Sequence, residues 1–290
     1  MTDLLDALLA DLKAEGDLLW NAVAGLDEDG WRTPTPAAGW DVATQVAHLL
    51  WTDEVAVAAA TDKQAWDALV LRAMEDPTGF VDASAHEVAR LSPPALLARW
   101  GKARAALATA LRDHPAGEKM PWFGPPMSPA SMATARFMET WAHAADVYAA
   151  LGIEQSALRD RQSDRIRNVA HLGVRTRDFA FSVHRLEAPA EEFRIELKAP
   201  SGEVWTWGPE GAAQSVTGSA YDFCLLVTQR VNREDTDLVA VGEDAERWLG
   251  IAQAFAGPPG EGRAAASVEP APSSVEPAPS SVEPVETRHE

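Results

Sequence analysis

Residues 136–148 of the 290-residue chain read Arg-Phe-Met-Glu-Thr-Trp-Ala-His-Ala-Ala-Asp-Val-Tyr, and the interpretation of the fold starts from this stretch. A capping hydroxyl followed by proline, Ser128-Pro129, predicts that a helix begins just before it. Glu139 and His143 then lie four residues apart on one helix face, with β-carbons about 5–6 Å apart. Two side chains at this spacing can bind one divalent cation, so the stretch predicts part of a metal site.

A third ligand has to come from another helix, and His48 is the candidate. It lies in a helix predicted from Asp41, a favourable N-cap residue, to about residue 61. Imidazole and carboxylate ligands suit zinc first, and also nickel, cobalt, manganese or ferrous iron. Three protein ligands leave one coordination position open, as in catalytic zinc sites. The plainer alternative is a buried histidine and a surface pair, but a carboxylate near Phe137 and Trp141 is costly unless paired or coordinated.

The remaining segments predict an α+β fold. Apolar periodicity and capping signals indicate helices at residues 2–26, 41–61, 63–74, 92–114 and 128–152. After these come a charged helix (163–184), strands (193–198, 204–207 and 214–217), a helix (221–231), a strand (238–241) and a last helix (244–255). We therefore expect a metal-binding four-helix bundle over residues 1–155 and a small mixed α/β domain over residues 156–257. Residues 258–290 contain a Pro/Ser/Glu repeat and predict a disordered acidic tail.

Composition narrows the function classes. The formal net charge of -19 argues against a nucleic-acid binder and against anionic membrane surfaces. Cys224 is the only cysteine, so an intramolecular disulfide and a thiolate metal cluster are both excluded. The sequence shows neither a signal-peptide pattern nor an apolar run of membrane-spanning length. We expect a cytoplasmic monomer or homodimer whose partners are small molecules.

Two motifs resemble a known family. Residues 39–49, Gly-Trp-Asp-Val-Ala-Thr-Gln-Val-Ala-His-Leu, resemble the Gly-Trp to Ala-His-Leu signature of the DinB-like metal-binding bundles. Residues 139–146 are similar to the Glu-x-x-x-His-x-x-Asp segment of the mycothiol-dependent maleylpyruvate isomerase branch. The resemblance covers residues 1–155 well and residues 193–255 more loosely. It implies that the metal ligands are His48, Glu139 and His143.

The resemblance also implies a thiol-dependent enzyme. A metal-bound low-molecular-weight thiol, mycothiol, would ionise near neutral pH and add to a small electrophilic substrate, in an isomerase or an S-transferase. Relatives carry an arginine near the end of the helix that follows a Gly-(Ser/Pro)-Ala start; Arg230 matches it best, and Arg233 competes. Catalytic residues beyond the metal site are not identified.

Alternatives stay open at this point. The metal could activate water, which would make the protein a hydrolase, or the site could belong to a non-catalytic metal-binding module. The chain also resembles proteins labelled by analogy with wyosine-base formation. Its net charge and its lack of Fe–S cysteines argue against such tRNA chemistry.

Overall fold

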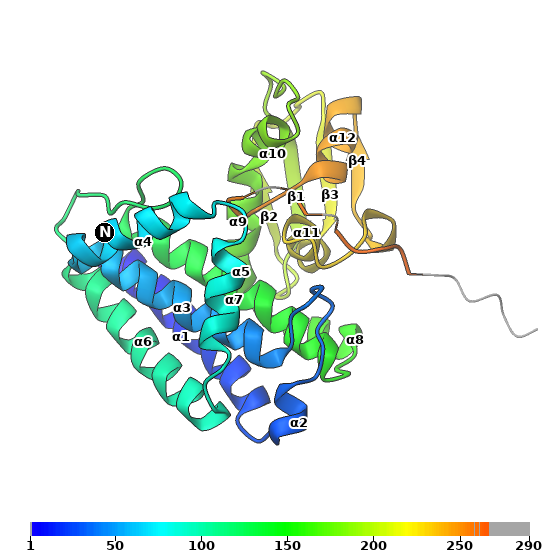
Figure 1. The fold of residues 1–290 in the computed structure, drawn as a ribbon. Helices are drawn as coiled ribbons and strands as arrows, with labels where there is room; N and C mark the ends of the chain where they lie inside the picture. The colour runs from blue at the N-terminus through cyan, green and yellow to red at the C-terminus, as the bar shows by residue number, and fades with distance from the viewer. Residues whose placement is uncertain (1, 258, 261, 267–290) are drawn as a thin grey trace, which may run out of the picture.

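The computed structural model describes residues 2–257, 259–260 and 262–266. A helical part, built from the first half of the chain, lies beside a smaller part that contains the sheet (Figure 1). The α+β class predicted from the sequence is confirmed. The predicted disordered tail over residues 258–290 falls largely outside the described residues.

Four long helices organise the helical part. They are α1 (Thr2–Val23), α3 (Val42–Thr61), α6 (Pro93–Asp113) and α7 (Pro129–Ala150). Helix α3 packs against both α6 and α7, and α1 packs against α7 (Figure 1). Leu19, Leu49, Leu96 and Trp100 are fully buried between them. Each such side chain contributes roughly 1.5–3 kcal/mol through burial, so apolar packing holds α1, α3 and α6 together.

Shorter helices fill the connections. They are α2 (Glu28–Trp31), α4 (Lys63–Glu75), α5 (Phe80–Val88) and α8 (Gln155–Asp160). The sequence predicts α4 but not the other three. Helix α5 follows Gly79, which has no side chain to cap it, but Phe80 and Ala85 are buried and α5 packs on α3. Tertiary packing therefore forms this helix.

The sequence predicts one continuous charged helix over residues 163–184, and this prediction is wrong. The segment is divided into η1 (Asp164–Ile166), α9 (Arg167–Arg175) and α10 (Arg177–Val183). The break is at Thr176, whose hydroxyl donates to the carbonyls of Leu172 and Gly173. Gly173 also lets α9 approach α11 (Ala220–Val227), because a β-carbon there would lie 2.8 Å from a methyl group of Val227.

The predicted strands form one four-stranded sheet. They are β1 (Arg194–Lys198), β2 (Val204–Trp207), β3 (Ser215–Ser219) and β4 (Val239–Val241), in the order β2-β1-β3-β4. Strand β1 pairs antiparallel with β2 and parallel with β3, and β3 pairs antiparallel with β4. The connecting helices are α11 (Ala220–Val227), η2 (Arg233–Asp235) and α12 (Glu243–Ile251). Alternate β1 residues Ile195 and Leu197 are buried, as the sequence predicts.

Helix α7 belongs to both cores. Ala144 and Val147 are buried with the helical part, whereas Phe137 and Trp141 are buried in one cluster with residues of α9, α11 and the sheet. The helix that carries Glu139 and His143 is therefore fixed from both sides. The domain boundary at residue 155 stays a prediction.

Candidate metal centre

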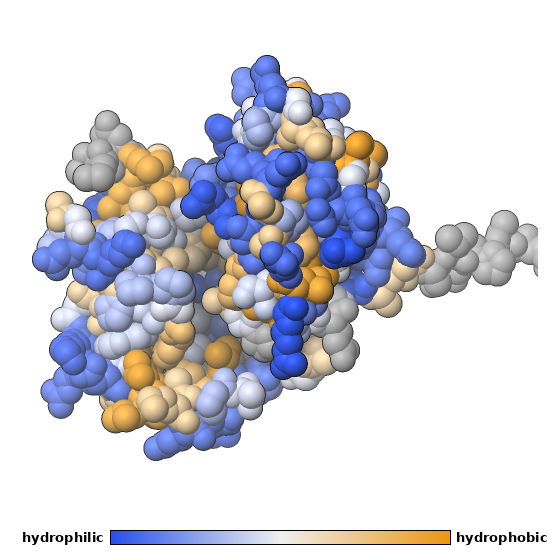
Figure 2. All heavy atoms as spheres, turned by 90° about the horizontal axis from the view of Figure 1, so that it is seen from above, coloured by the Kyte–Doolittle hydropathy of each residue, from blue (hydrophilic) through white to orange (hydrophobic). Residues whose placement is uncertain are grey.

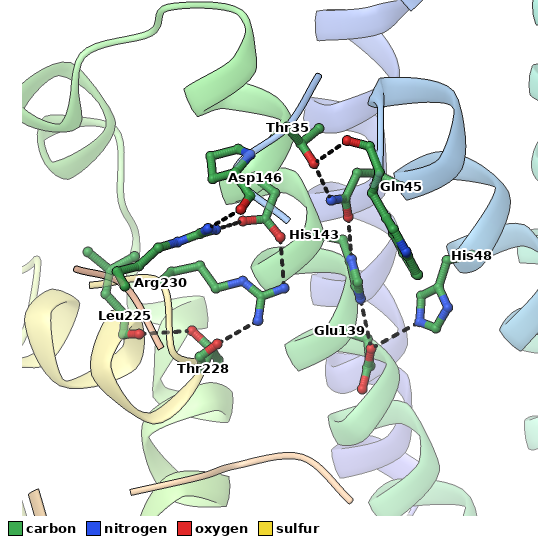
Figure 3. Close-up of polar contacts among 12 residues, drawn as sticks. Thr35, Gln45, His48, Glu139, His143, Asp146, Leu225, Thr228 and Arg230 are labelled. Atoms are coloured by element: carbon green, nitrogen blue, oxygen red, sulfur yellow. Dashed lines mark hydrogen bonds and ion pairs between the residues drawn. The ribbon is translucent and has the colours of Figure 1, made fainter. Parts of the chain in front are cut away.

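The structure brings His48, Glu139 and His143 together where α3 faces α7 (Figure 3). Each side chain offers one ligand atom, and the three atoms lie within 4.8 Å of one another. His48 Nε2 lies 3.4 Å and His143 Nε2 lies 3.2 Å from the same carboxylate oxygen, Oε2 of Glu139. Within the part of the chain that the structure describes, no other group of three such side chains has this geometry.

The protonation states of the cluster suit a metal ion. Burial alone would raise the pKa of Glu139, but the polar contacts with His143 and His48 outweigh burial and hold that pKa well below its ordinary value. Burial and the neighbouring His48 lower the pKa of His143 to about 4. At neutral pH the carboxylate is therefore ionised and the His143 imidazole is neutral, which are the forms that bind metals.

Gln45 orients His143 (Figure 3). The Thr35 hydroxyl donates to the Trp40 carbonyl over 2.9 Å, so it accepts from the amide nitrogen of Gln45, also over 2.9 Å. The other amide atom, Oε1, is then an acceptor, and it lies 2.5 Å from Nδ1 of His143. Nδ1 therefore carries the proton, and the lone pair of Nε2 faces Glu139. Such partners fix the orientation of a metal-ligating histidine.

Sequence reasoning missed Gln45 as a functional residue. It lies three positions before His48 on α3, so both side chains project from the same helix face. That spacing is a weak signal, because any residue at that position would share the face. Only the fold shows that Gln45 reaches His143, which is 98 positions away in the sequence.

Tryptophan rings flank the cluster. The Trp40 ring centroid lies 5.3 Å from that of His48 and 5.8 Å from that of His143. The Trp51 ring centroid lies 6.2 Å from that of His48. Nδ1 of His48 is buried and has no hydrogen-bond partner among the described residues, so packing against the tryptophans and the contact of Nε2 with Glu139 position this ring. The rings surround the ligand atoms with a low-dielectric wall, which strengthens electrostatic interactions with a bound cation.

A cavity of about 410 Å³ lies beside Trp40. Its lining combines cationic, polar and aromatic side chains: Arg32, Pro34, Thr35, Gly39, Trp40, Asp41, Thr44, His86, Ala89 and Arg90. Seen from above, the molecular surface is also hollowed between the helical part and the part with the sheet, and hydrophilic side chains gather over the latter (Figure 2). A small polar ligand therefore has room next to the cluster.

Of the two competing arginines, Arg230 is the one near the cluster. Gln229 has a left-handed conformation (φ 60°), and the backbone N–H of Arg230 donates to the Leu225 carbonyl, which ends α11. The Arg230 guanidinium then donates to Oδ2 of Asp146 over 2.8 Å, one turn beyond His143 on α7. Arg230 is also one of the charges that depress the pKa of His143.

Arg233 is directed elsewhere. Its guanidinium donates to the Thr236 hydroxyl over 3.2 Å and pairs with Glu246 of α12 at 3.4 Å. Among the described residues, these contacts keep Arg233 within the part of the molecule that contains the sheet.

The fold and the site together define an α+β protein whose helices bring two histidines and a glutamate to one point. A sequence model described as the mycothiol maleylpyruvate isomerase N-terminal domain matches residues 12–148, and one described as wyosine base formation matches residues 189–241. Two uncharacterized proteins from two strains of Mycobacterium tuberculosis are each 56% identical over 255 residues, which are 88% of this chain and 97% of theirs. Residues 12–148 therefore belong to the mycothiol maleylpyruvate isomerase N-terminal domain family, and the chain as a whole is a relative of the two mycobacterial proteins.

Solved structures support the fold. The crystal structure of the mycothiol-dependent maleylpyruvate isomerase aligns with a TM-score of 0.52, and a histidine-to-alanine mutant of that enzyme aligns with a TM-score of 0.51. Each alignment covers 81% of this chain and 92% of the other, at 14% identity. No helix in the described ranges combines the length and the apolarity needed to cross a membrane.

Proposed function

We propose that this protein is a metal-dependent enzyme that uses a low-molecular-weight thiol of the mycothiol type. Its reaction would be isomerisation of a small electrophilic substrate or transfer of the thiol onto that substrate. The observation that supports this most is the convergence of His48, Glu139 and His143 in a chain of this family. Zinc suits a set of two imidazoles and one carboxylate, and nickel, cobalt, manganese and ferrous iron also accept such ligands.

In this proposal, different residues would position the metal ligands, exclude water and attract the substrate. When bound, a divalent cation supplies the positive charge that lowers the pKa of a coordinated thiol. Gln45 keeps Nε2 of His143 free to coordinate, and Trp40 shields the ligand atoms from bulk water. Arg230 places a guanidinium near the cluster, where it attracts an anionic substrate.

The reacting thiol would have to come from outside the protein. Cys224 is fully buried, and its S–H donates to the Ile166 carbonyl. Burial raises the pKa of this thiol far above neutral pH, so it stays protonated. We propose a cytoplasmic location, because the co-substrate is a cellular thiol. The expectation of a monomer or homodimer stays a prediction.

A cobalt-substituted protein tests this proposal. Adding mycothiol should change the visible spectrum of bound cobalt and should be required for isomerisation of maleylpyruvate or a related electrophile. His48→Ala should abolish both responses, while His171→Ala, which changes an exposed histidine outside both the cluster and the lining of the cavity beside Trp40, should keep them. A hydrolase would show metal-dependent turnover without thiol, and a binding module would bind metal without either reaction; each result would contradict the proposal.

A further inference from the structure

The loop before α3, residues 32–41, carries Trp40 and reaches a candidate metal ligand through two side chains. The Thr35 hydroxyl accepts from the side-chain amide of Gln45, and Oε1 of Gln45 in turn contacts Nδ1 of His143 (Figure 3). The loop also closes on itself, because the backbone N–H of Thr35 donates to the Trp40 carbonyl over 2.8 Å. The orientation of His143 and the position of Trp40 therefore both depend on where this loop lies.

The tip of the loop is attached to the rest of the protein by Arg263. Pro36 and Gly39 at the tip are exposed, so burial contributes little to fixing them. The backbone bonds of the loop, such as that from the Trp40 N–H to the Ala37 carbonyl, shape the turn without attaching it to another element. The Arg263 guanidinium donates to the Pro36 carbonyl over 2.7 Å and supplies this attachment.

Arg263 is itself anchored to α7 and to the part of the molecule that contains the sheet. Its guanidinium donates to Oδ1 of Asp146, whose side chain is only 1% exposed. Its carbonyl accepts from the side-chain amide of Asn232 over 2.7 Å, and the backbone N–H of Ala266 donates to Asp235 over 2.9 Å. The Arg263 side chain is 25% exposed, and this shielding from water strengthens its hydrogen bonds.

These contacts form a closed path that begins and ends on α7. From His143 the path runs through Gln45 to the loop, and from the loop it returns through Arg263 to Asp146. His143 and Asp146 are three positions apart on a helix that is packed from both sides. A loop held at two points of one rigid helix has little freedom to move away from it, so Trp40 stays beside the ligand atoms.

We propose that Arg263 is a positioning residue of the metal centre. It holds the loop over residues 32–41 against α7, and this keeps Trp40 beside the ligand atoms and Gln45 on His143. The inference rests on the proposed function in that the cluster binds a metal. It adds to the site a residue that lies 117 positions after Asp146 in the sequence. Without Arg263, the loop opens more often and the ligand atoms become accessible to water and to chelators.

Amide hydrogen exchange of the full-length chain without metal tests the attachment of the loop. In Arg263→Ala, the backbone N–H groups of Thr35 and Trp40 should exchange about tenfold faster or more, because the loop that contains their acceptors opens more often. Arg263→Lys should fall between this variant and the wild type. It keeps the charge but loses the planar fork that spans Pro36 and Asp146.

Release of zinc to a chromophoric chelator gives a second measurement, on the metal-loaded protein. Zinc should leave Arg263→Ala about tenfold faster than the wild type, since the support of His143 and the shielding by Trp40 are both weakened. Arg159→Ala is the matched control, because Arg159 also pairs with a buried carboxylate, that of Asp222, but in a different place. Its loop amides and its zinc release should keep the wild-type rates.

Unchanged exchange of the Thr35 and Trp40 amides in a folded Arg263→Ala protein would overturn the inference. An equal acceleration in Arg159→Ala would also overturn it, because the effect would then follow from the loss of any buried ion pair. So would zinc release at the wild-type rate from Arg263→Ala. Zinc binding that depends on Arg263 in this way, without any thiol reaction, would instead overturn only the proposed function.

Discussion

Two buried polar contacts join α3 to α7, and they differ in how the negative charge is balanced. Near the middle of both helices, Nε of Arg136 donates to Oδ1 of Asp53 over 3.0 Å, and both side chains are at most 5% exposed. In the His48–Glu139–His143 cluster the carboxylate has no arginine or lysine partner among the described residues. In the first contact, Arg136 balances the negative charge of Asp53 within the protein. The second leaves a negative charge that a cation from outside can balance.

The largest expected effect, on the free energy of unfolding, comes from breaking the ion pair between Asp53 and Arg136. Asp53→Ala leaves the Arg136 guanidinium buried without its carboxylate, and this should lower the free energy of unfolding by about 3–5 kcal/mol. The folded fraction should still bind zinc with wild-type stoichiometry. Urea denaturation and metal analysis measure the two quantities. If the variant lost metal while keeping its stability, Asp53 would contribute to metal binding and not to stability, which would contradict this account.

A third buried carboxylate sharpens the comparison, because Glu15 has only a distant cation, Arg165 at 3.8 Å. Burial raises the pKa of Glu15 to about 7, against the opposing charge of Arg165. Between its unfolded value of 4.5 and about 7, the folded protein binds more protons than the unfolded chain. Stability should therefore fall as the pH rises through this window, by an amount on the order of 3 kcal/mol.

Glu15→Gln should remove that part of the pH dependence. The difference in unfolding free energy between variant and wild type should grow in favour of the variant from about pH 5 to about pH 8. Urea midpoints at several pH values give this difference directly, and other titrating groups cancel in it. A constant difference across this range would show that Glu15 does not carry the effect.

Replacing Gln45, which orients His143, should have a smaller effect. This effect should be on metal affinity and not on the free energy of unfolding. Gln45→Ala removes the acceptor that fixes the His143 imidazole, so zinc affinity should drop about 10- to 100-fold. Competition with a chromophoric chelator measures this. Gln162→Ala, which changes a glutamine bonded to Trp141 instead, should keep wild-type affinity. Equal affinities for Gln45→Ala and wild type would contradict the orienting role.

The smallest effect should come from the cap of α3. The Asp41 carboxylate accepts from the backbone N–H of Thr44 over 2.8 Å and from its hydroxyl over 2.7 Å. Asp41→Ala should cost about 1 kcal/mol in unfolding free energy, since one capping interaction is lost. Zinc affinity should change little, because the helix stays packed through its apolar face. A large loss of affinity would show that the start of α3 positions His48.

Local signals were enough for the four long helices and for two of the three residues of the cluster. Glu139 and His143 share one helix face by spacing alone, and Asp41 marks the start of α3. His48 was the candidate third ligand because it lies in another predicted helix, and the resemblance to a family supported it. Its partners could not be read from the pattern of α3, because contacts such as Gln45 to His143 join residues 98 positions apart.

The tail shows a different limit of sequence reasoning. Composition assigns residues 258–290 to one disordered segment, because Pro, Ser and Glu dominate it. Arg263 lies before the repeats, and its guanidinium reaches Asp146. A composition average cannot register one side chain with a buried partner, so the boundary of the tail at residue 258 stays a prediction.

The most direct test is the zinc content and zinc affinity of wild type, His48→Ala and Asp53→Ala, each purified without added metal. Our account predicts one tightly bound ion per chain in wild type and in the folded fraction of Asp53→Ala, and its loss in His48→Ala with little change in stability of the metal-free protein. If His48→Ala retained the ion with wild-type affinity, or if wild type bound none, the cluster between α3 and α7 would not be a metal centre.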